Sequence, residues 1–275
     1  MANIILEENI ELINEIIGNK IADIKVERAV LGLFFTGVKL NNGFGGLCFT
    51  PIKEIPEAVC CPSSAKAMPI SGKLSNRPVL DYLKDLSSEN SLRKALAIAA
   101  LNALSQYCLE LGAYKEFEIT ENCDAFDKID VKKFRKAVVV GVLVPMIKKL
   151  IAGNADFKIL EKDPSTLKAH EMNYFIPADR YEEIVPSADL LVITGVTVLN
   201  DTLPYILKIA KKGAEILVTG PTASMLPQPF FKRNVTMIGG IAVTKPDELL
   251  DIIAEGGSGY HFFGKYANRI MIKAK

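Results

Sequence analysis

The second half of the chain alternates short, continuously apolar runs with segments of helical character, and this alternation is what most constrains the fold. Residues 137–140 read AVVV, a run typical of a strand that is covered on both faces. The runs that repeat this pattern are 157–160, 190–193, 216–218 and 237–238, and the helical segments between them are 145–152, 178–185, 202–212 and 246–255. Strands that alternate with helices in this way predict a parallel, doubly wound α/β sheet.

The first 120 residues follow a different pattern, in which helices flank a hairpin. Apolar residues recur at one-face helical spacing over 6–17, and Gly18 ends that helix. Two β-rich runs, 25–40 and 44–50, are joined by an Asn-Asn-Gly turn at 41–43, for which we expect a positive φ at both central residues. Pro78 begins a short helix, and 91–111 forms a long Ala/Leu-rich helix that ends at Gly112.

These two patterns predict an α/β protein of two domains. The first is an α+β domain over residues 1–120, and the second is a parallel-sheet α/β domain over residues 121–275. The boundary falls in the polar stretch 116–130. The length of 275 residues agrees with this division, since a domain has about 150 residues.

The charge balance limits the partners. The chain has 33 Lys and Arg against 32 Asp and Glu, a formal net charge of +1. A general nucleic-acid or membrane-surface binder needs a basic excess, so we expect neither partner. A small-molecule ligand is expected, and a homo-oligomer is left open.

The start of the chain and its cysteines indicate a cytoplasmic protein. The first eight residues have no basic segment followed by an apolar core, as a signal peptide would. The five cysteines are odd in number and lack C-x-x-C spacing, so they do not predict a disulfide framework. Cys60 and Cys61 are adjacent, and a partly buried thiol pair explains them better than a metal site.

Ligands of open parallel sheets bind beyond the carboxyl ends of the strands, at the point where the strand order reverses. Five segments of this chain fall at such ends: 141–145, Glu161 with its neighbours, 194–202, 220–222 and 239–240. Their glycines, threonines, asparagine and carboxylate offer backbone N–H donors and hydroxyls to a polar or anionic ligand.

The segment at Gly141 speaks against a nucleotide cofactor, whereas Glu161 is consistent with one. A dinucleotide site needs G-x-G-x-x-G, whereas this chain has Gly141 alone, followed by three bulky residues. The glycine run of methyltransferases is missing too. Glu161, however, comes twenty residues after Gly141, where an acidic residue grips a ribose in dinucleotide folds. The cofactor therefore stays unknown.

Two loops and one helix residue have both a structural and a functional interpretation. In 194–202, Thr202 or Asp201 caps the next helix, whereas Thr197 and Asn200 are free to face a ligand. The loop from 220 to 234 is either a covering flap or a packing strut. Asn102 is either a satisfied core residue or a group that reaches the space between the domains.

Motifs of nucleophilic and metal chemistry do not occur in the sequence. His170 and His261 are the only histidines and lie 91 residues apart. The sequence has no G-x-S-x-G, no H-E-x-x-H and no cluster of Asp, Glu and His at metal-ligand spacing. We therefore predict no metal-ligating residues.

Taken together, the segments resemble the putative heavy-metal-chelation family, first catalogued as a domain of unknown function. The segments that carry the resemblance are VVVGVLVP at 138–145, Glu161, TGVTVLNDT at 194–202, GPT at 220–222 and the pair Gly239-Gly240, with GFGGLCFT at 43–50 and ALAIAALNALS at 95–105 in the first half. The resemblance covers nearly the whole chain. It implies an enolase-N-terminal-like domain followed by a Rossmann-like domain, with an active site between them.

The resemblance also implies a function: a condensation or hydrolysis step in the metabolism of pterin-, flavin- or siderophore-like chelators. In this hypothesis Glu161 and Asn200 are the catalytic candidates, Glu161 either as a general base or as a group that binds a ligand hydroxyl. The substrate-binding candidates are Gly141, Thr194, Gly195, Thr197, Thr202, Gly220, Pro221, Thr222, Gly239 and Gly240.

Two other functions are retained. One is a non-catalytic protein that binds a metal or a metal chelate. The other is an enzyme that depends on NAD or S-adenosylmethionine.

Overall fold

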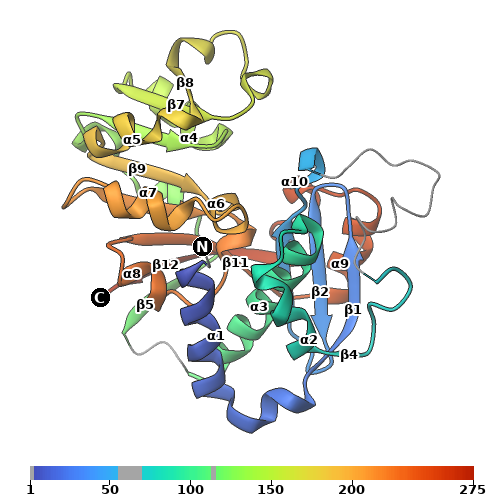
Figure 1. Ribbon diagram of the computed structural model, residues 1–275. Coiled ribbons are helices and arrows are strands. Elements are labelled where there is room, and N and C mark those ends of the chain that lie inside the picture. The colour runs from blue at the N-terminus through green and yellow to red at the C-terminus, as the bar shows by residue number, and fades with distance from the viewer. Residues whose placement is uncertain (1–2, 55–69, 113–115) are drawn as a thin grey trace.

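The computed structural model describes residues 3–54, 70–112 and 116–275. Its strands are β1 (Lys25–Leu31), β2 (Phe35–Leu40), β3 (Gly45–Phe49), β4 (Arg77–Pro78), β5 (Phe117–Glu121), β6 (Ala137–Val140), β7 (Phe157–Glu161), β8 (Phe175–Pro177), β9 (Leu190–Thr194), β10 (Glu215–Thr219), β11 (Met237–Val243) and β12 (Ala267–Ala274). Its α-helices are α1 (Ile4–Ile17), α2 (Val79–Leu83), α3 (Ser91–Glu110), α4 (Val144–Ala152), α5 (Tyr181–Ile184), α6 (Val196–Leu199), α7 (Leu203–Ile209), α8 (Gln228–Phe231), α9 (Pro246–Ala254) and α10 (Gly259–Phe262). The predicted α/β class is confirmed (Figure 1).

The large sheet has the strand order β5-β12-β11-β10-β9-β6-β7-β8. The strands from β6 to β11 pair in parallel, and read from β8 to β11 they follow the order 3-2-1-4-5-6 of doubly wound sheets. Their order reverses between β6 and β9, which makes this pair the switch point. β12 and β5 extend one edge as antiparallel strands, which the apolar runs did not predict.

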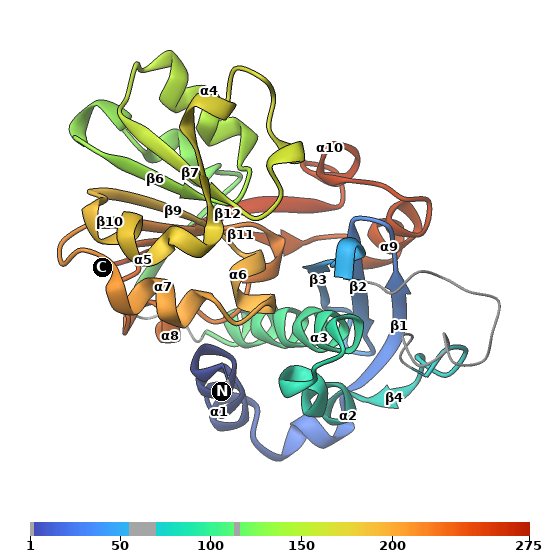
Figure 2. The same ribbon diagram turned by 45° about the horizontal axis from the view of Figure 1, so that its top comes forward.

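The two faces of the large sheet are covered differently, because alternate residues of each strand point to opposite sides. On one face Ala137 and Val139 pack with α4 and the turns at 125–133. On the other face Val138 and Val140 join a larger core that includes α1, α3, α7 and α8. Helices of the first half of the chain therefore cover one face of the large sheet (Figure 2).

The small sheet has the order β3-β2-β1-β4 and contains the predicted hairpin. The expected run 25–40 is two strands, β1 and β2, separated by a turn at 32–34. Of the residues at 41–43, only Gly43 has a positive φ, at 89°, so the expectation for both central residues is wrong. The loop is one residue longer than a two-residue turn, and glycine occupies its third position, where a three-residue hairpin needs that conformation.

Both faces of the small sheet are covered, one by α3 and the other by α9. A Cβ built on Gly46 of β3 would lie 2.2 Å from the carbonyl oxygen of Ala99 in α3, so glycine alone allows this approach. On the opposite face a Cβ on Gly37 would meet Leu250 of α9 at 2.6 Å. Because α9 comes late in the chain, residues from both ends build this layer. The division near residue 120 stays a prediction.

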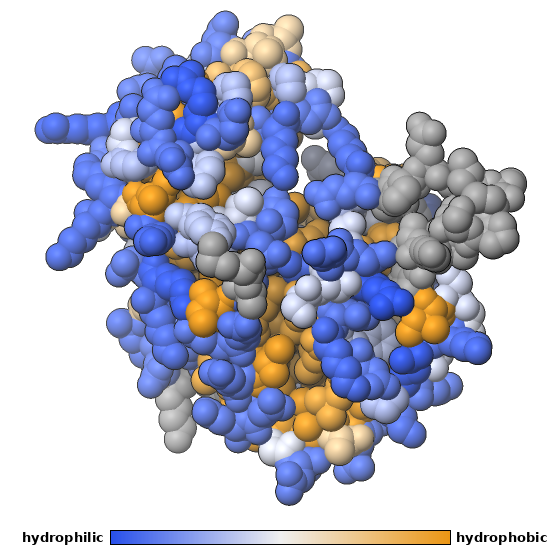
Figure 3. Space-filling model, viewed as in Figure 1, coloured by the Kyte–Doolittle hydropathy of each residue, from blue (hydrophilic) through white to orange (hydrophobic). Residues whose placement is uncertain are grey.

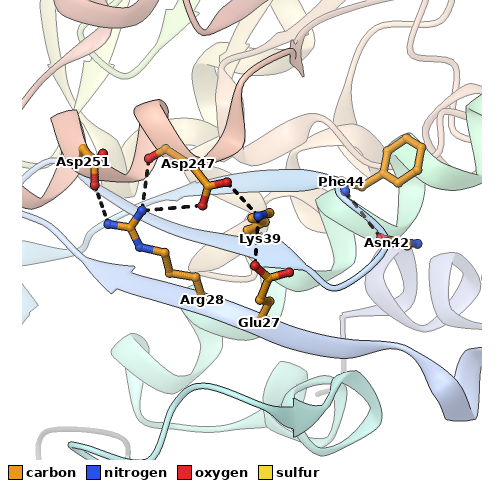
Figure 4. Close-up of polar contacts among 7 residues, drawn as sticks. All are labelled: Glu27, Arg28, Lys39, Asn42, Phe44, Asp247 and Asp251. Atoms are coloured by element: carbon orange, nitrogen blue, oxygen red, sulfur yellow. Dashed lines mark hydrogen bonds and ion pairs between the residues drawn. The ribbon is translucent and has the colours of Figure 1, made fainter.

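Charged side chains tie α9 to the small sheet (Figure 4). Arg28 of β1 bonds Asp251 at 2.5 Å, and Lys39 of β2 bonds Asp247 at 2.7 Å and Glu27 at 2.9 Å. The bond between Lys39 and Asp247 lowers the pKa of the Asp247 carboxyl. These contacts hold the start of α9 in register with β1 and β2.

Candidate functional site

The switch point brings two of the predicted residues together. Gly141 follows β6 with a φ of 87°, and a Cβ there would lie 2.8 Å from the methyl carbon of Thr194 at the end of β9. Thr194 is half-buried, and its Oγ1 accepts a bond of 3.4 Å from the N–H of Val196. Glycine is therefore required at 141 for the two strand ends to approach so closely.

Glu161 ends β7, the neighbour of β6 on the other side. Its Oε1 accepts bonds from the N–H groups of Lys162, at 2.8 Å, and Asp163, at 3.0 Å. These bonds hold the half-buried carboxylate at the carboxyl edge of the sheet, and they occupy one of its two oxygens. We call Gly141, Glu161 and Thr194 the edge cluster.

A segment of the first half reaches the loop beside the edge cluster. Lys53, in the short turn Ile52–Glu54 after β3, forms an ion pair with Asp163. The Lys53 ammonium and the Ser165 hydroxyl lower the pKa of the Asp163 carboxyl to about 2. The contact joins two parts of the chain that are 110 positions apart, and no local sequence signal indicated it.

The loop 194–202 is bonded mainly to itself and to the first half of the chain. Thr197 is 3% exposed and donates to the carbonyl of Thr194 at 2.7 Å. The Asn200 Oδ1 accepts the Thr202 hydroxyl at 2.6 Å. The predicted cap by Thr202 or Asp201 is wrong, since Thr202 precedes α7 without a side-chain cap bond and Asp201 pairs with the buried Lys94.

The GPT segment lies in a buried junction with the first half, centred on Asn102 of α3. The Asn102 Nδ2 donates to the carbonyls of Leu47 at 2.7 Å and of Pro221 and Thr222 at 3.1 Å each. The Thr222 Oγ1 accepts from the N–H of Phe49 at 3.0 Å, and the Oδ1 of Asn102 is buried without a partner among the described residues. Asn102 is thus both a core residue and a link between the two sheets.

The remaining predicted glycines serve close packing. A Cβ on Gly195 would lie 3.0 Å from the N of Ala223, and one on Gly239 would lie 2.6 Å from the Thr219 Oγ1. A Cβ on Gly240 would be 3.1 Å from the Ser224 Oγ. Gly220 has a φ of 123°, and its N–H bonds the carbonyl of Gly239 at 2.8 Å.

The loop from 220 to 234 is largely buried, with Met225, Leu226 and Phe230 at 0% exposure. In a flap that covers a ligand, these side chains would face the ligand site rather than the protein core. The burial of the loop supports the packing strut over the flap.

The donors in the described ranges do not fit a heavy-metal ion held by protein side chains alone. Within residues 3–54, 70–112 and 116–275, no three His, Cys, Asp or Glu side chains form a group that could hold a metal. Burial raises the pKa values of the Cys48 and Cys108 thiols to about 12. His170 lies beside Glu171 and His261 beside Ser258. Cys60 and Cys61 lie outside the described residues.

We expect Cys48 and Cys108 to resist alkylation in the folded protein. A thiol with a pKa near 12 is almost wholly protonated at pH 8, and the thiolate is the reactive form. Iodoacetamide labelling followed by peptide mapping should find both residues unmodified, and labelling in guanidinium chloride should modify both. Rapid labelling of Cys48 in the folded state would contradict its burial on β3.

Two cavities lie away from the edge cluster. One, of about 390 Å³, lies at the amino ends of the parallel strands and is lined by Lys128, Glu215 and Met237 among others. The other, of about 570 Å³, lies between the start of α1, α7 and the end of α8.

In the part of the chain that the structure describes, no helix is both long and apolar enough to span a membrane.

Comparisons with known proteins agree on one family. Two family models, both described as "Putative heavy-metal chelation", match residues 124–272 and 14–105. An uncharacterized protein of Methanocaldococcus jannaschii is 28% identical over 191 residues, which are 69% of this chain and 70% of the relative.

Two crystal structures resemble the fold. A protein of unknown function from Pyrococcus horikoshii matches with a TM-score of 0.76 and 21% identity over 98% of this chain and 100% of that one. A second, from Desulfitobacterium hafniense, matches with a TM-score of 0.72 and 19% identity over 97% and 99%. These likenesses show the fold alone.

Proposed function

Because the chain belongs to the family described as putative heavy-metal chelation, we propose that it binds and transforms a small metal-chelating metabolite at its edge cluster. The observation that carries the proposal is the contact of Gly141 with Thr194 at the switch point, beside Glu161. In doubly wound sheets this is where ligands bind. The metabolite, rather than a set of protein donors, would hold the metal.

The edge cluster suits a ligand with hydroxyl or amino groups. Glu161 is fixed by two backbone bonds to one oxygen, so its other oxygen is positioned to accept a hydrogen bond from the ligand. In a hydrolysis or condensation the same carboxylate would take a proton from water or from the attacking group. Thr194 would donate its hydroxyl, and Gly141 gives the ligand access to the backbone.

The other predicted residues have a supporting part in the proposal. Asn200 would orient the loop through its bond to Thr202 rather than act on the substrate. Thr197, Thr222, Pro221, Gly195, Gly220, Gly239 and Gly240 would fix the strand ends behind the edge cluster. Lys53 and Asp163 would close one side of the site, between the two halves of the chain.

The test is a thermal-shift screen with pterin-6-carboxylate, flavin mononucleotide and 2,3-dihydroxybenzoate, each with and without Ni²⁺ or Fe³⁺. A ligand at 100 times its Kd adds about 2.7 kcal/mol, which raises Tm by about 5–10 °C in a chain of this size. Mass spectrometry of each stabilising mixture then detects turnover. Stabilisation by a metal complex without turnover would favour the non-catalytic binding protein.

We expect Glu161→Gln to weaken binding of a stabilising compound about tenfold and to abolish any turnover. The glutamine oxygen still accepts the two backbone bonds, so the fold is preserved while the charge is lost. Glu182→Gln, an exposed change on α5, is the matched control and should behave as wild type. Unchanged binding and turnover in Glu161→Gln would remove both roles of Glu161.

The position of Glu161 is the reason to include nucleotides in the screen. Glu161 ends the second strand of the parallel order, where dinucleotide-binding proteins place the carboxylate that grips the ribose. NAD, NADP and S-adenosylmethionine are therefore included at millimolar concentration. If any of them raises the Tm of wild type but not of Glu161→Gln, the ligand of the edge cluster is a nucleotide rather than a chelator.

A further inference from the structure

The cavity of about 570 Å³ lies on the face of the large sheet that α1, α3, α7 and α8 cover, away from the edge cluster. The first turn of α1, the length of α7 and the residues after α8 surround it, and these elements lie side by side in both ribbon views (Figures 1 and 2). Its volume is within the range of sites for small organic ligands.

One part of the cavity lining is apolar and open. Ile4 is 41% exposed and Tyr205 is 43% exposed, although both are large hydrophobic residues, and Pro204 and Leu207 lie beside them. Figure 3 shows this side of the molecule, where orange apolar patches are scattered over a mostly blue polar surface. Such a surface suits a flat hydrocarbon ring system, which buries apolar area on both partners.

The other part of the lining has excess positive charge. Arg233 is held by Glu8 through bonds of 3.0 and 2.8 Å, and the Arg233 bond lowers the pKa of the Glu8 carboxyl. Asp201 is matched in the same way by Lys94, which is almost completely buried.

With these two pairs set aside, the lining has two further cations, Lys208 and Lys232. The Nζ of Lys232 lies 3.9 Å from the Oε2 of Glu8, a carboxylate that Arg233 already engages through both oxygens. The lining as a whole is therefore cationic beside an apolar floor.

We propose that this cavity is a second binding site, which takes an organic anion with a flat apolar body and one acidic group such as phosphate, sulfonate or carboxylate. The rings lie against Ile4 and Tyr205, and the acidic group lies between Lys208 and Lys232. The site does not depend on the proposed function of the edge cluster, because none of the edge cluster residues lines it.

The test measures binding of 1-naphthyl phosphate by isothermal titration calorimetry to the full chain with any purification tag removed. We expect 1-naphthyl phosphate to bind at least tenfold more tightly than inorganic phosphate or 1-naphthol, because only it engages both parts of the lining. We expect Lys208→Glu/Lys232→Glu to weaken its binding at least tenfold.

The matched control is Lys148→Glu/Lys212→Glu, which has the same change of net charge at exposed positions outside the cavity lining. It should bind within twofold of wild type, and so should Glu161→Gln. The four lysines are exposed, and circular dichroism melting verifies that each variant, including Glu161→Gln, is folded.

Three results would overturn the proposal. They are equal binding by 1-naphthol, equal binding by inorganic phosphate, and an equal loss in the cavity and control variants. A loss in Glu161→Gln with no loss in Lys208→Glu/Lys232→Glu would place the anion at the edge cluster instead. The fate of the proposed function is thus read separately from that of this cavity.

Discussion

Gly46→Ala is expected to destabilise the protein by about 3 kcal/mol or more, the upper range for overpacking a core. The added Cβ would lie 2.2 Å from the carbonyl oxygen and 2.5 Å from the amide nitrogen of Ala99 and Ala103, respectively. Both are backbone atoms of α3, so no side-chain rotation can relieve the contact. Urea denaturation followed by circular dichroism measures the loss, and a protein that is insoluble at 25 °C is the extreme of the same result.

Gly43→Ala is the control for that substitution. Gly43 has a φ of 89° but open space around its Cβ position, so alanine there costs conformational strain of about 1 kcal/mol without a clash. A Gly46→Ala protein no less stable than the Gly43→Ala protein would show that β3 and α3 can separate, contrary to the packing described above.

Asn102→Asp is expected to cost about 3–5 kcal/mol at pH 8, the range for a buried charge without a partner. The amide nitrogen that donates to three carbonyls would become a carboxylate oxygen that faces the same three acceptors. The side chain at 102 is 2% exposed, so water cannot compensate. The substitution therefore acts on the link between the small sheet and the GPT turn.

The pH dependence of this variant has a definite sign. The folded protein disfavours the charged form of the introduced carboxyl, so its pKa in the folded state is raised above that of the unfolded chain. Its penalty is therefore smallest at low pH and grows as pH rises through the unfolded-state pKa and on to the folded-state pKa.

Asn102→Ala, which has no titratable group at this position, provides the comparison. Urea midpoints of the two variants at pH 5 and pH 8 measure the difference. A penalty that is the same at both pH values relative to Asn102→Ala would contradict burial of the group.

The residues that were placed correctly from sequence are those whose signals are local. The glycine ends of α1 and α3, the apolar runs of β6 and β9, and the position of Glu161 at a strand end all depend on neighbours within a few positions. Such signals report periodicity and backbone freedom directly. The structure places Gly141 against Thr194 because both follow such strands.

The features that sequence reasoning missed depend on distant partners. Thr202 or Asp201 was expected to cap α7, but Thr202 makes no cap bond, and Asp201 binds Lys94, 107 positions earlier. Lys53 and Asp163 are similarly remote, and neither residue has a local pattern that indicates the other. Strands β5 and β12 are paired with each other across nearly the whole second half of the chain. β5, at the edge of the sheet, lacks a continuous apolar run, and β12 pairs antiparallel on both sides, so neither strand belongs to the parallel strand-helix pattern.

The position of α9 has a consequence for the order of events during synthesis. Leu250 and Ile253 cover the face of the small sheet that includes Gly37, and the adjoining turn at Gly32, from about 200 positions later in the chain. A ribosome makes about 5–20 residues per second, so α9 is synthesised on the order of ten seconds after the strands that it covers. During that interval the nascent sheet exposes Val30, Phe35 and Leu47, which pack with α9 in the finished molecule. Cells that express this chain are expected to shield the emerging N-terminal half, and truncation before α9 should yield an aggregating fragment.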